Sequence, residues 1–292
     1  MRVLVLVPPA DYRTEWQWAF EPQAQALRDA GLDVEHMPWT EVGPLAGFDL
    51  VLPLVVWGYH TRYGDWLGLL ARLEREGVAV TNPVETLRWN GDKGYLAELD
   101  SKGVATVPSL AFSSLSEQAL ALARDEFACT DLVVKPTVSA SAYGTVRLGP
   151  NDRFPEQVRG WRMLVQPWLN AITDSGEYSL MYFGGRFSHA VSKVPKAGEF
   201  RVQPEYGGII ERCEPPAGAT ELSEAALAHA PTPSTYARVD IVVGNDGNLQ
   251  VIELEMIEPA LFLDRAPEAA AAFGESVRLA AERAREQPLP YR

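Results

Sequence analysis

The sequence predicts a mixed α/β and α+β chain, with an N-terminal parallel-sheet domain, a small α+β unit and a larger antiparallel unit. Strand-like and helical segments alternate over the first 86 residues, which is typical of a parallel sheet with helical crossovers. Short strands and one helix follow, and the chain from residue 163 is rich in strand-forming residues. We therefore expect an N-terminal domain at 1–86, a small subdomain at 87–162 and a large C-terminal subdomain at 163–292.

The N-terminal elements follow from hydrophobic pattern and turn residues. Residues 2–7 are apolar without alternation, as expected of a strand buried on both faces. Helices are predicted at 16–30, where Gly31 is the expected C-cap, and at 63–77. Further strands are predicted at 34–37, 49–56 and 78–81, although Pro53 weakens the second of these.

The later elements are shorter and more varied. A helix is expected at 87–103, which contains Lys93, and another at 116–127. Strands are expected at 104–107, 132–135 and 144–148, and the β-rich section runs from Met163 to Leu254. An alanine-rich stretch at 267–285 predicts a closing helix.

Composition excludes several classes of partner. The 292 residues are 47% hydrophobic and 22% charged, which is ordinary for a globular protein. The formal net charge of −13 argues against binding to nucleic acid or to an anionic membrane. Cys129 and Cys213 stand apart from each other and from any metal-like motif, and the opening run MRVLVLVP is too short to span a membrane. We expect a cytoplasmic protein with small-molecule partners.

The stretch from Tyr236 to Pro259 is the most informative part of the chain. It reads as two strands joined by Asn245-Asp246-Gly247-Asn248, and an Asp-Gly pair predicts a two-residue hairpin loop. Asp240 then falls opposite Glu253, with Glu255 on the same face. Three converging carboxylates repel one another unless a cation joins them, and oxygen ligands alone suit Mg²⁺ or Mn²⁺. The alternative is a solvated acidic hairpin face.

Two further segments fit a nucleotide, although the chain has no Rossmann glycine motif, no P-loop and no G-x-S-x-G. Lys135 ends the strand LVVKP, and small residues at 137–145 follow it; they would let backbone N–H groups approach a polyphosphate. The run Met163–Leu169 can offer an N–H of Trp168 or Leu169 to an adenine edge, since Pro167 cannot donate. The alternatives are a surface hairpin and an ordinary core strand.

This ordered set resembles the ATP-grasp ligase superfamily, most closely its glutathione-synthetase-like branch, over roughly residues 85–265. The resemblance rests on a lysine in a helix, a lysine before proline, a small-residue loop, the segment 166–169, Arg201, Arg238-Val239-Asp240 and Glu253-Leu254-Glu255. It implies an ATP-grasp fold, in which a pre-grasp domain precedes two subdomains that clamp ATP. It also implies ATP and Mg²⁺, or Mn²⁺, as cofactors.

The resemblance assigns a role to each matching position. Lys93 and Lys135 would contact the phosphates, together with the loop residues Ser139, Ser141, Gly144 and Thr145. Gln166, Trp168 and Leu169 would line the adenine pocket, and Glu177 would reach the ribose. Arg201 and Lys135 would be the catalytic groups, and Asp240, Glu253 and Glu255 the metal ligands. Two positions depart from the pattern: Glu255 stands where Asn is usual, and Gly144 is the only glycine of the loop.

Substrate contacts are expected at the carboxyl ends of the N-terminal strands, where open α/β sheets bind ligands. The candidates are polar and aromatic residues that could recognise an amino-acid-like zwitterion, and Glu258 after the hairpin joins them; the full set is Asp11, Glu15, Trp57, Tyr59, His60, Arg62 and Glu258. The alternative is that the aromatic residues only pack the domain.

The expected activity is that of an ATP-dependent carboxylate–amine ligase acting through an acyl phosphate on a small amino-acid-like substrate. Three alternatives stay open: an intramolecular cyclo-ligase of the cycloserine-forming type, a small-molecule kinase with the same clamp, and a nucleotide-binding protein without turnover. The sequence leaves the acceptor, the nucleophile and the oligomeric state open, and a homo-oligomer is compatible with it.

Overall fold

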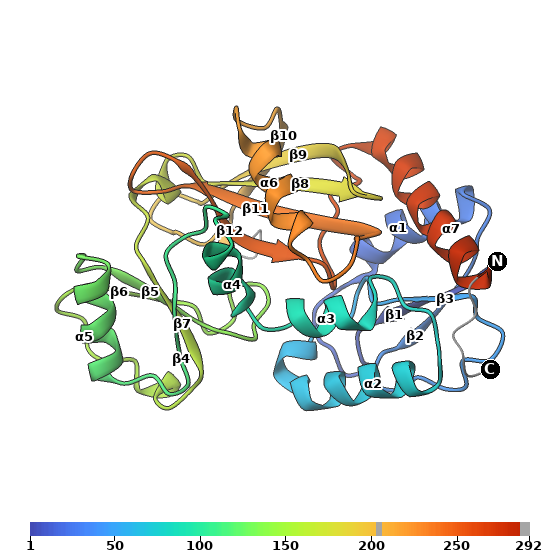
Figure 1. The fold of residues 1–292 in the computed structure, drawn as a ribbon, viewed down its shortest axis with the longest axis horizontal. Helices are drawn as coiled ribbons and strands as arrows, with labels where there is room; N and C mark the ends of the chain where they lie inside the picture. The colour runs from blue at the N-terminus through green and yellow to red at the C-terminus, as the bar shows by residue number, and fades with distance from the viewer. Residues whose placement is uncertain (203–205, 287–292) are drawn as a thin grey trace.

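The computed structural model describes residues 1–202 and 206–286, which form three sheets in three bodies (Figure 1). The N-terminal sheet is parallel, with β1 (Arg2–Val7) between β2 (Asp33–Pro38) and β3 (Leu50–Leu52). The third strand is shorter than predicted and stops before Pro53, and the predicted strand at 78–81 is reduced to a bridge between Val80 and Val51. Helices α1 (Gln17–Asp29) and α2 (Tyr63–Arg75) cover this sheet, and the 3-10 turn η1 (Tyr59–Arg62) precedes α2.

The second body is a four-stranded antiparallel sheet in the order β4-β7-β5-β6. Its strands are β4 (Leu110–Phe112), β5 (Leu132–Pro136), β6 (Val146–Leu148) and β7 (Met163–Pro167). Helix α5 (Glu117–Glu126) packs on one face through a core that includes Leu120, Val134 and Val165. The side chain of Ser116 caps that helix by accepting from the Ala119 N–H. Lys135 and Gln166 belong to the opposite face, since strand residues alternate.

The third body is a five-stranded antiparallel sheet in the order β10-β9-β8-β11-β12. The strands are β8 (Glu177–Phe183), β9 (Arg186–Val194), β10 (Ile209–Cys213), β11 (Tyr236–Val243) and β12 (Leu249–Glu255). Helices α4 (Tyr95–Ser101) and α6 (Ala219–Ala228) pack on one face through residues such as Leu180, Val239 and Leu254. The other face packs partly on the N-terminal domain and carries charged residues in the remainder, as described below.

Two predictions in the linker region are wrong. The expected helix at 87–103 is broken into α3 (Val84–Asn90) and α4, and Lys93 lies in the turn between them. The break is fixed by tertiary contacts: the backbone N–H of Lys93 donates to the Thr137 carbonyl, and a Cβ at Gly91 would lie 2.7 Å from the Tyr63 hydroxyl. The expected strand at 104–107 is only an isolated bridge, whereas β4 was not predicted.

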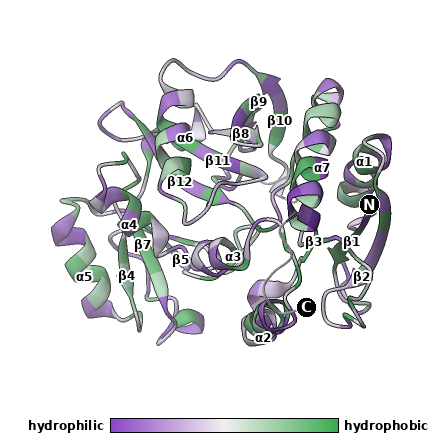
Figure 2. Ribbon diagram, turned by 45° about the vertical axis from the view of Figure 1, so that its right-hand side comes forward, coloured by the Kyte–Doolittle hydropathy of each residue, from purple (hydrophilic) through white to green (hydrophobic). Residues whose placement is uncertain are grey.

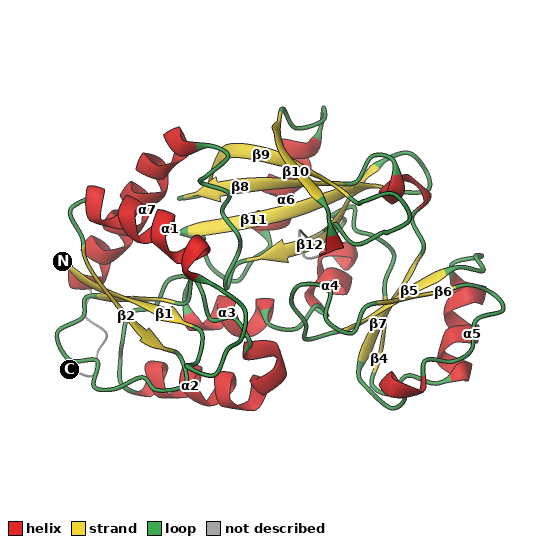
Figure 3. Ribbon diagram, turned by 180° about the vertical axis from the view of Figure 1, so that it is seen from behind, coloured by secondary structure: helices red, strands yellow, loops and turns green. Residues whose placement is uncertain are grey.

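The closing helix α7 (Ala270–Glu286) returns to the N-terminal domain. It lies beside α1 in opposite views of the molecule (Figures 1 and 3), and a Cβ at Gly274 would come within 2.5 Å of the Ala26 carbonyl oxygen. Figure 2 shows hydrophobic and hydrophilic segments alternating along this helix, as expected of a helix that covers one face. Among the described residues, the helices are too short or too polar to cross a membrane.

Candidate active site

The hairpin of β11 and β12 places Asp240 opposite Glu253, as the sequence predicts. The route to that register differs from the prediction. The loop has three residues rather than two, because Gly244 and Asn248 are the pair that closes it and Gly247 alone has positive φ. A bulge then leaves Ile252 without a partner in the ladder and restores the predicted pairing.

The carboxylates of this hairpin meet basic side chains on the same face. The Arg238 guanidinium lies 2.8 Å from Asp240 Oδ2 and 2.5 Å from Glu255 Oε1, which brings Asp240 and Glu255 to one group. Asp240 also lies 3.4 Å from Lys193 Nζ and accepts a hydrogen bond from Ser179. Burial alone would raise the pKa of Asp240, but Arg238 and Lys193 lower it well below the usual range, so Asp240 is ionised.

The chemistry of this donor set fits a divalent cation. Asp240, Glu253 and Glu255 supply only oxygen, come from adjacent strands and face the same side, as Mg²⁺ prefers. Protein cations satisfy each of them in the structure, and the described part of the chain contains no group of three acidic, His or Cys side chains arranged to hold a metal. Mg²⁺ binding would therefore require these ion pairs to rearrange.

Two lysines face this acidic surface from the turn after α3 and from β5. Lys93 Nζ donates to the Ser139 carbonyl at 2.6 Å and lies 3.1 Å from Glu253 Oε1. Lys135 is 7% exposed, and its ammonium group makes no hydrogen bond or ion pair with any residue that the structure describes. Burial lowers the pKa of Lys135 to about 8, and Glu253 opposes this shift. A buried lysine without a partner is suited to an anionic ligand.

The loop at 137–145 connects β5 to β6 and contacts the N-terminal domain. Ser139 donates to the Pro136 carbonyl, and Thr145 closes a turn on Ala142. Ser141 and Gly144 have positive φ, at 48° and 67°. The ring of Tyr143 lies 5.2 Å from that of His60, so the predicted phosphate loop also reaches the predicted substrate side.

The predicted adenine segment keeps one backbone donor. The Trp168 N–H donates to the Asp131 carbonyl and is not available, whereas the Leu169 N–H has no acceptor in the described part of the chain. Asn245 of the hairpin loop accepts from the Asn170 N–H and donates to the Trp168 carbonyl, which fixes this segment. Of the two donors that the sequence offered, Leu169 is the one left for a ligand.

Three predicted side chains are engaged within the protein. Gln166 donates to the Ser109 hydroxyl at 2.8 Å. Glu177 pairs with Lys193 and is buried, and burial raises its pKa to about 7. Arg201 lies 2.6 Å from Glu199 Oε2, in the segment between β9 and β10. Their predicted contacts with ATP stay predictions.

The substrate candidates divide into two groups. Asp11 and Glu15 are exposed, and Arg62 pairs with Asp65 at the surface. Trp57 packs in an aromatic cluster, with its ring 5.6 Å from that of Trp18.

Tyr59, His60 and Glu258 instead face the charged surface. Burial lowers the pKa of His60 to about 4, and Lys93 adds to this effect. Burial, and then Glu255, raise the pKa of Glu258 to about 8. Tyr59 packs in the same core as Ile257, the residue before Glu258, and its pKa is raised first by burial and then by the charge of Glu258.

Arg238 and Lys193 lie on the same face as the carboxylates, and neither was assigned a role from the sequence. Arg238 is two positions before Asp240 on β11, and Lys193 of β9 pairs with Glu177 of β8 in the strand register. Extending the two-residue periodicity to basic residues would have found Arg238.

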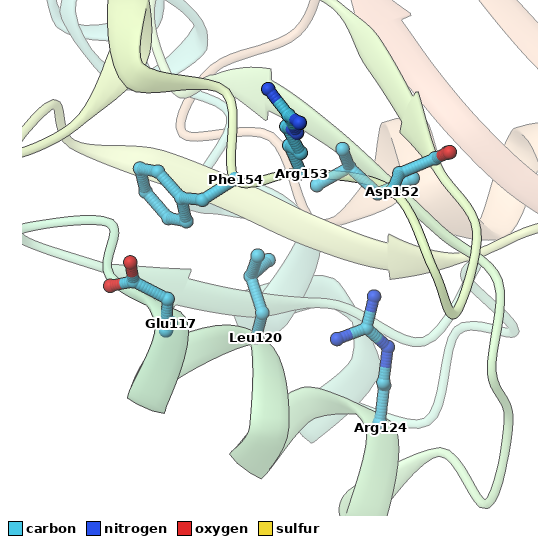
Figure 4. Close-up of a pocket in the computed structure, with 7 residues that line it drawn as sticks. Glu117, Leu120, Arg124, Asp152, Arg153 and Phe154 are labelled. Carbon is cyan, nitrogen blue, oxygen red and sulfur yellow. The ribbon is translucent and has the colours of Figure 1, made fainter.

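A small hollow lies away from these charged residues, between α5 and the loop that follows β6 in the small sheet. Figure 4 shows Glu117, Leu120 and Arg124 projecting from α5 toward the loop that carries Asp152, Arg153 and Phe154. Arg124 is committed to the carbonyls of Thr130 and Gly149, and Glu117 pairs with Arg159. Asp152 accepts from the Gly149 N–H, and Arg153 is exposed to solvent.

Comparison with known proteins finds relatives of this chain in both of its parts, the N-terminal domain and the region that follows it. The model of the N-terminal domain of D-cycloserine synthetase DcsG matches residues 5–82. The cycloserine biosynthesis protein DcsG of Streptomyces lavendulae is 29% identical over 282 residues, covering 88% of this chain and 91% of the relative. Glutathione synthetase of Prochlorococcus marinus (strain MIT 9313) is 31% identical over 219 residues, covering 68% of this chain and 67% of the relative.

The chain belongs to the ATP-grasp ligase superfamily. The crystal structure of D-cycloserine synthetase DcsG matches with a TM-score of 0.83 and 26% identity, covering 97% of this chain and 99% of that one. D-alanine–D-alanine ligase from Bacillus anthracis shares the fold at a TM-score of 0.71 and 19% identity, covering 98% and 99% of the two chains. Membership in the glutathione-synthetase-like branch makes this ATP-grasp protein an ATP-dependent ligase, with ATP and Mg²⁺ as its cofactors.

Proposed function

We propose that this ATP-grasp ligase activates the carboxylate of a small amino-acid-like molecule and joins it to an amine. A carboxylate oxygen would attack the γ-phosphorus of ATP, forming an acyl phosphate and releasing ADP. The amine nitrogen would then attack the acyl carbon, so that inorganic phosphate leaves and the nitrogen loses a proton. The proximity of Lys93 and Lys135 to Asp240, Glu253 and Glu255 supports this proposal. The lysines would contact the phosphates, and the carboxylates would bind Mg²⁺.

Each residue of the site would act mainly by positioning and by stabilising charge. Lys135 would pair with the phosphates at no cost to an existing ion pair, and Lys93 would exchange Glu253 for phosphate oxygen. Arg201 would leave Glu199 and present its planar guanidinium to the transferred group. Bound to Asp240, Glu253 and Glu255, Mg²⁺ would neutralise charge on the phosphates.

Ring closure within one substrate is a second candidate. The observation that favours it is the likeness to DcsG along nearly the whole chain, including the N-terminal domain, where substrate residues are expected. In that reaction the attacking nitrogen belongs to the molecule that carries the activated carboxylate, and no second organic substrate is needed.

The test is ADP and phosphate release with ATP, Mg²⁺ and a panel of carboxylates, with hydroxylamine as a general nucleophile and mass spectrometry of the products. A ligase yields hydroxamates and free phosphate. A ring-closing enzyme releases phosphate without added amine and gives a product one water lighter than its substrate. Retention of the phosphoryl group on the product would identify a kinase, and ATP binding without ADP release would identify a nucleotide-binding protein.

A further inference from the structure

Among the described residues, the acidic and basic side chains of this charged surface pair with one another, with two exceptions. Glu177, Asp240, Glu253 and Glu255 each lie within 4.0 Å of a lysine or arginine nitrogen. Glu258 does not: within residues 1–202 and 206–286, no Lys, Arg or His nitrogen comes that close to its carboxylate. The complementary exception is Lys135, the unpaired cation described above. Within the part of the chain that the structure describes, this charged surface therefore offers one unpaired cation and one unpaired anion.

The segment that carries Glu258 is held rigidly at the junction between the large sheet and the N-terminal domain. The Met256 N–H donates to Asn90 Oδ1, and Asn82 Nδ2 donates to the Met256 carbonyl, both at 2.8 Å. The Tyr236 hydroxyl donates to the Ile257 carbonyl at 3.0 Å. Met256 and Ile257 are both buried, in the cores on the two sides of this junction. The backbone leading to Glu258 is therefore held in place, and the side chain of Glu258 is partly buried.

The groups around Glu258 do not supply its missing charge. Tyr59 and Tyr236 both feel the negative charge of Glu258. At Glu258 itself, Glu255 and Glu253 add negative potential, and Lys93 opposes them from beyond ion-pair distance. Burial and the neighbouring Glu255 together raise the pKa of Glu258. His60, next to Tyr59, has a buried Nδ1 without a hydrogen-bond partner, so the N-terminal wall of this region also holds an unused polar atom.

We propose that Glu258 determines which carboxylate substrate the enzyme accepts. This substrate, the acceptor of the phosphoryl group, would carry a protonated amine beside its reacting carboxylate, and Glu258 would bind that amine. The proposal rests on the proposed ligase function, because it concerns the acceptor of that reaction. An ammonium group on the substrate would give Glu258 the cationic partner that the described side chains around it do not supply. The two would form a charge-assisted hydrogen bond, which is strong in a partly buried site. Amine-free carboxylic acids would leave Glu258 unpaired and would bind poorly.

The first experiment measures turnover. The D- and L-forms of the common amino acids are compared with their α-hydroxy and deaminated analogues, with ATP, Mg²⁺ and hydroxylamine, for wild type and Glu258→Gln. We expect wild type to prefer amine-bearing acids by about 10–100-fold in kcat/KM, the range for a hydrogen bond to a charged group. Glu258→Gln should lose that preference mainly through a higher KM, and Glu258→Asp should regain part of it.

The second experiment measures binding without turnover. The same pairs of acids are added with ADP and Mg²⁺, and the rise in thermal midpoint is recorded. Nucleotide alone should stabilise Glu258→Gln as much as wild type, which shows that the variant is folded. The control Glu126→Gln, at an exposed site on α5, should behave as wild type in both assays.

The two experiments separate the two proposals. Amine-dependent stabilisation that needs Glu258, without any hydroxamate or phosphate, would reject the ligase function and keep the amine site. Equal use and equal binding of acids with and without an amine would overturn the role of Glu258, and so would an unchanged preference in Glu258→Gln.

Discussion

Lys93 Nζ lies 3.1 Å from Glu253 Oε1, and this ion pair joins the turn after α3 to the edge strand β12. The side chains are 8% and 26% exposed, so neither charge is well solvated. The pair holds together a phosphate-binding candidate and a metal-ligand candidate. Binding of Mg-ATP would separate them and give each a new partner.

Replacing Lys93 by Ala should destabilise the free protein by about 3 kcal/mol, because Glu253 would be left as a poorly solvated charge. Urea denaturation measures this change. The matched control is Lys102→Ala, which breaks an exposed ion pair with Glu98 and should cost no more than about 0.5 kcal/mol. Equal losses of unfolding free energy in the two variants would show that the Lys93–Glu253 pair contributes no more to stability than an exposed ion pair.

Replacing Lys135 by Met should have the opposite effect on the free protein. The folded state holds the pKa of Lys135 at about 8, against an ordinary value of 10.5, so the buried charge opposes folding at neutral pH. The variant should be more stable than wild type by about 1–3 kcal/mol below pH 8. This advantage should fade as the pH rises toward 10.5, where both states of the wild type lose the proton. Calorimetric titration should show weaker ATP binding.

Replacing Arg201 by Ala should lower kcat by about 10²–10³-fold while ATP still raises the thermal midpoint, because the residue is assigned to the transferred group and not to nucleotide binding. Lys should not substitute, since it lacks the planar fork. Arg186→Ala, at an exposed position of β9, is the control. An equal loss of turnover and of ATP binding would contradict the assignment.

The β11–β12 hairpin shows which features of the site the sequence could predict and which it could not. The two-residue loop expected at Asp246-Gly247 put Asp240 opposite Glu253, which is the observed pair, although the loop has three residues. The bulge at Ile252 offsets the extra loop residue and so restores the predicted pair. The turn motif therefore predicted the facing carboxylates, whereas neither the longer loop nor the bulge was predicted.

Contacts between segments distant in sequence explain two features that the sequence did not predict: the break in the helix around Lys93 and the use of the Trp168 N–H within the protein. The helix predicted around Lys93 breaks because the Thr137 carbonyl takes its backbone N–H. The Trp168 N–H, one of two candidate adenine donors, is used by Asp131. Neither partner is near in sequence, so local propensity could not anticipate these choices.

Replacing Glu255 by Asn should weaken Mg²⁺ binding without abolishing it. One negative charge is lost while an oxygen donor stays, and Arg238 keeps its pair with Asp240. We expect roughly a tenfold weaker affinity in calorimetric titrations of Mg²⁺ in the presence of ADP, equal to about 1.4 kcal/mol. Glu211→Gln, at an exposed position of β10, is the control. Unchanged affinity in Glu255→Asn would remove Glu255 from the metal ligands.

Replacing His60 by Gln should make the protein less sensitive to acid. The folded state lowers the pKa of His60 from 6.5 to about 4, mainly by burial, so the unfolded chain takes up this proton first as the pH falls. The stabilising effect of a neutral His60 is complete above pH 6.5 and is lost on the way to pH 4. At pH 5 the loss is about 2 kcal/mol, an upper value because the ring is partly exposed. Urea denaturation at pH 7 and pH 5 should show a smaller loss in His60→Gln than in wild type, and parallel losses would mean that the ring protonates as readily in the folded protein.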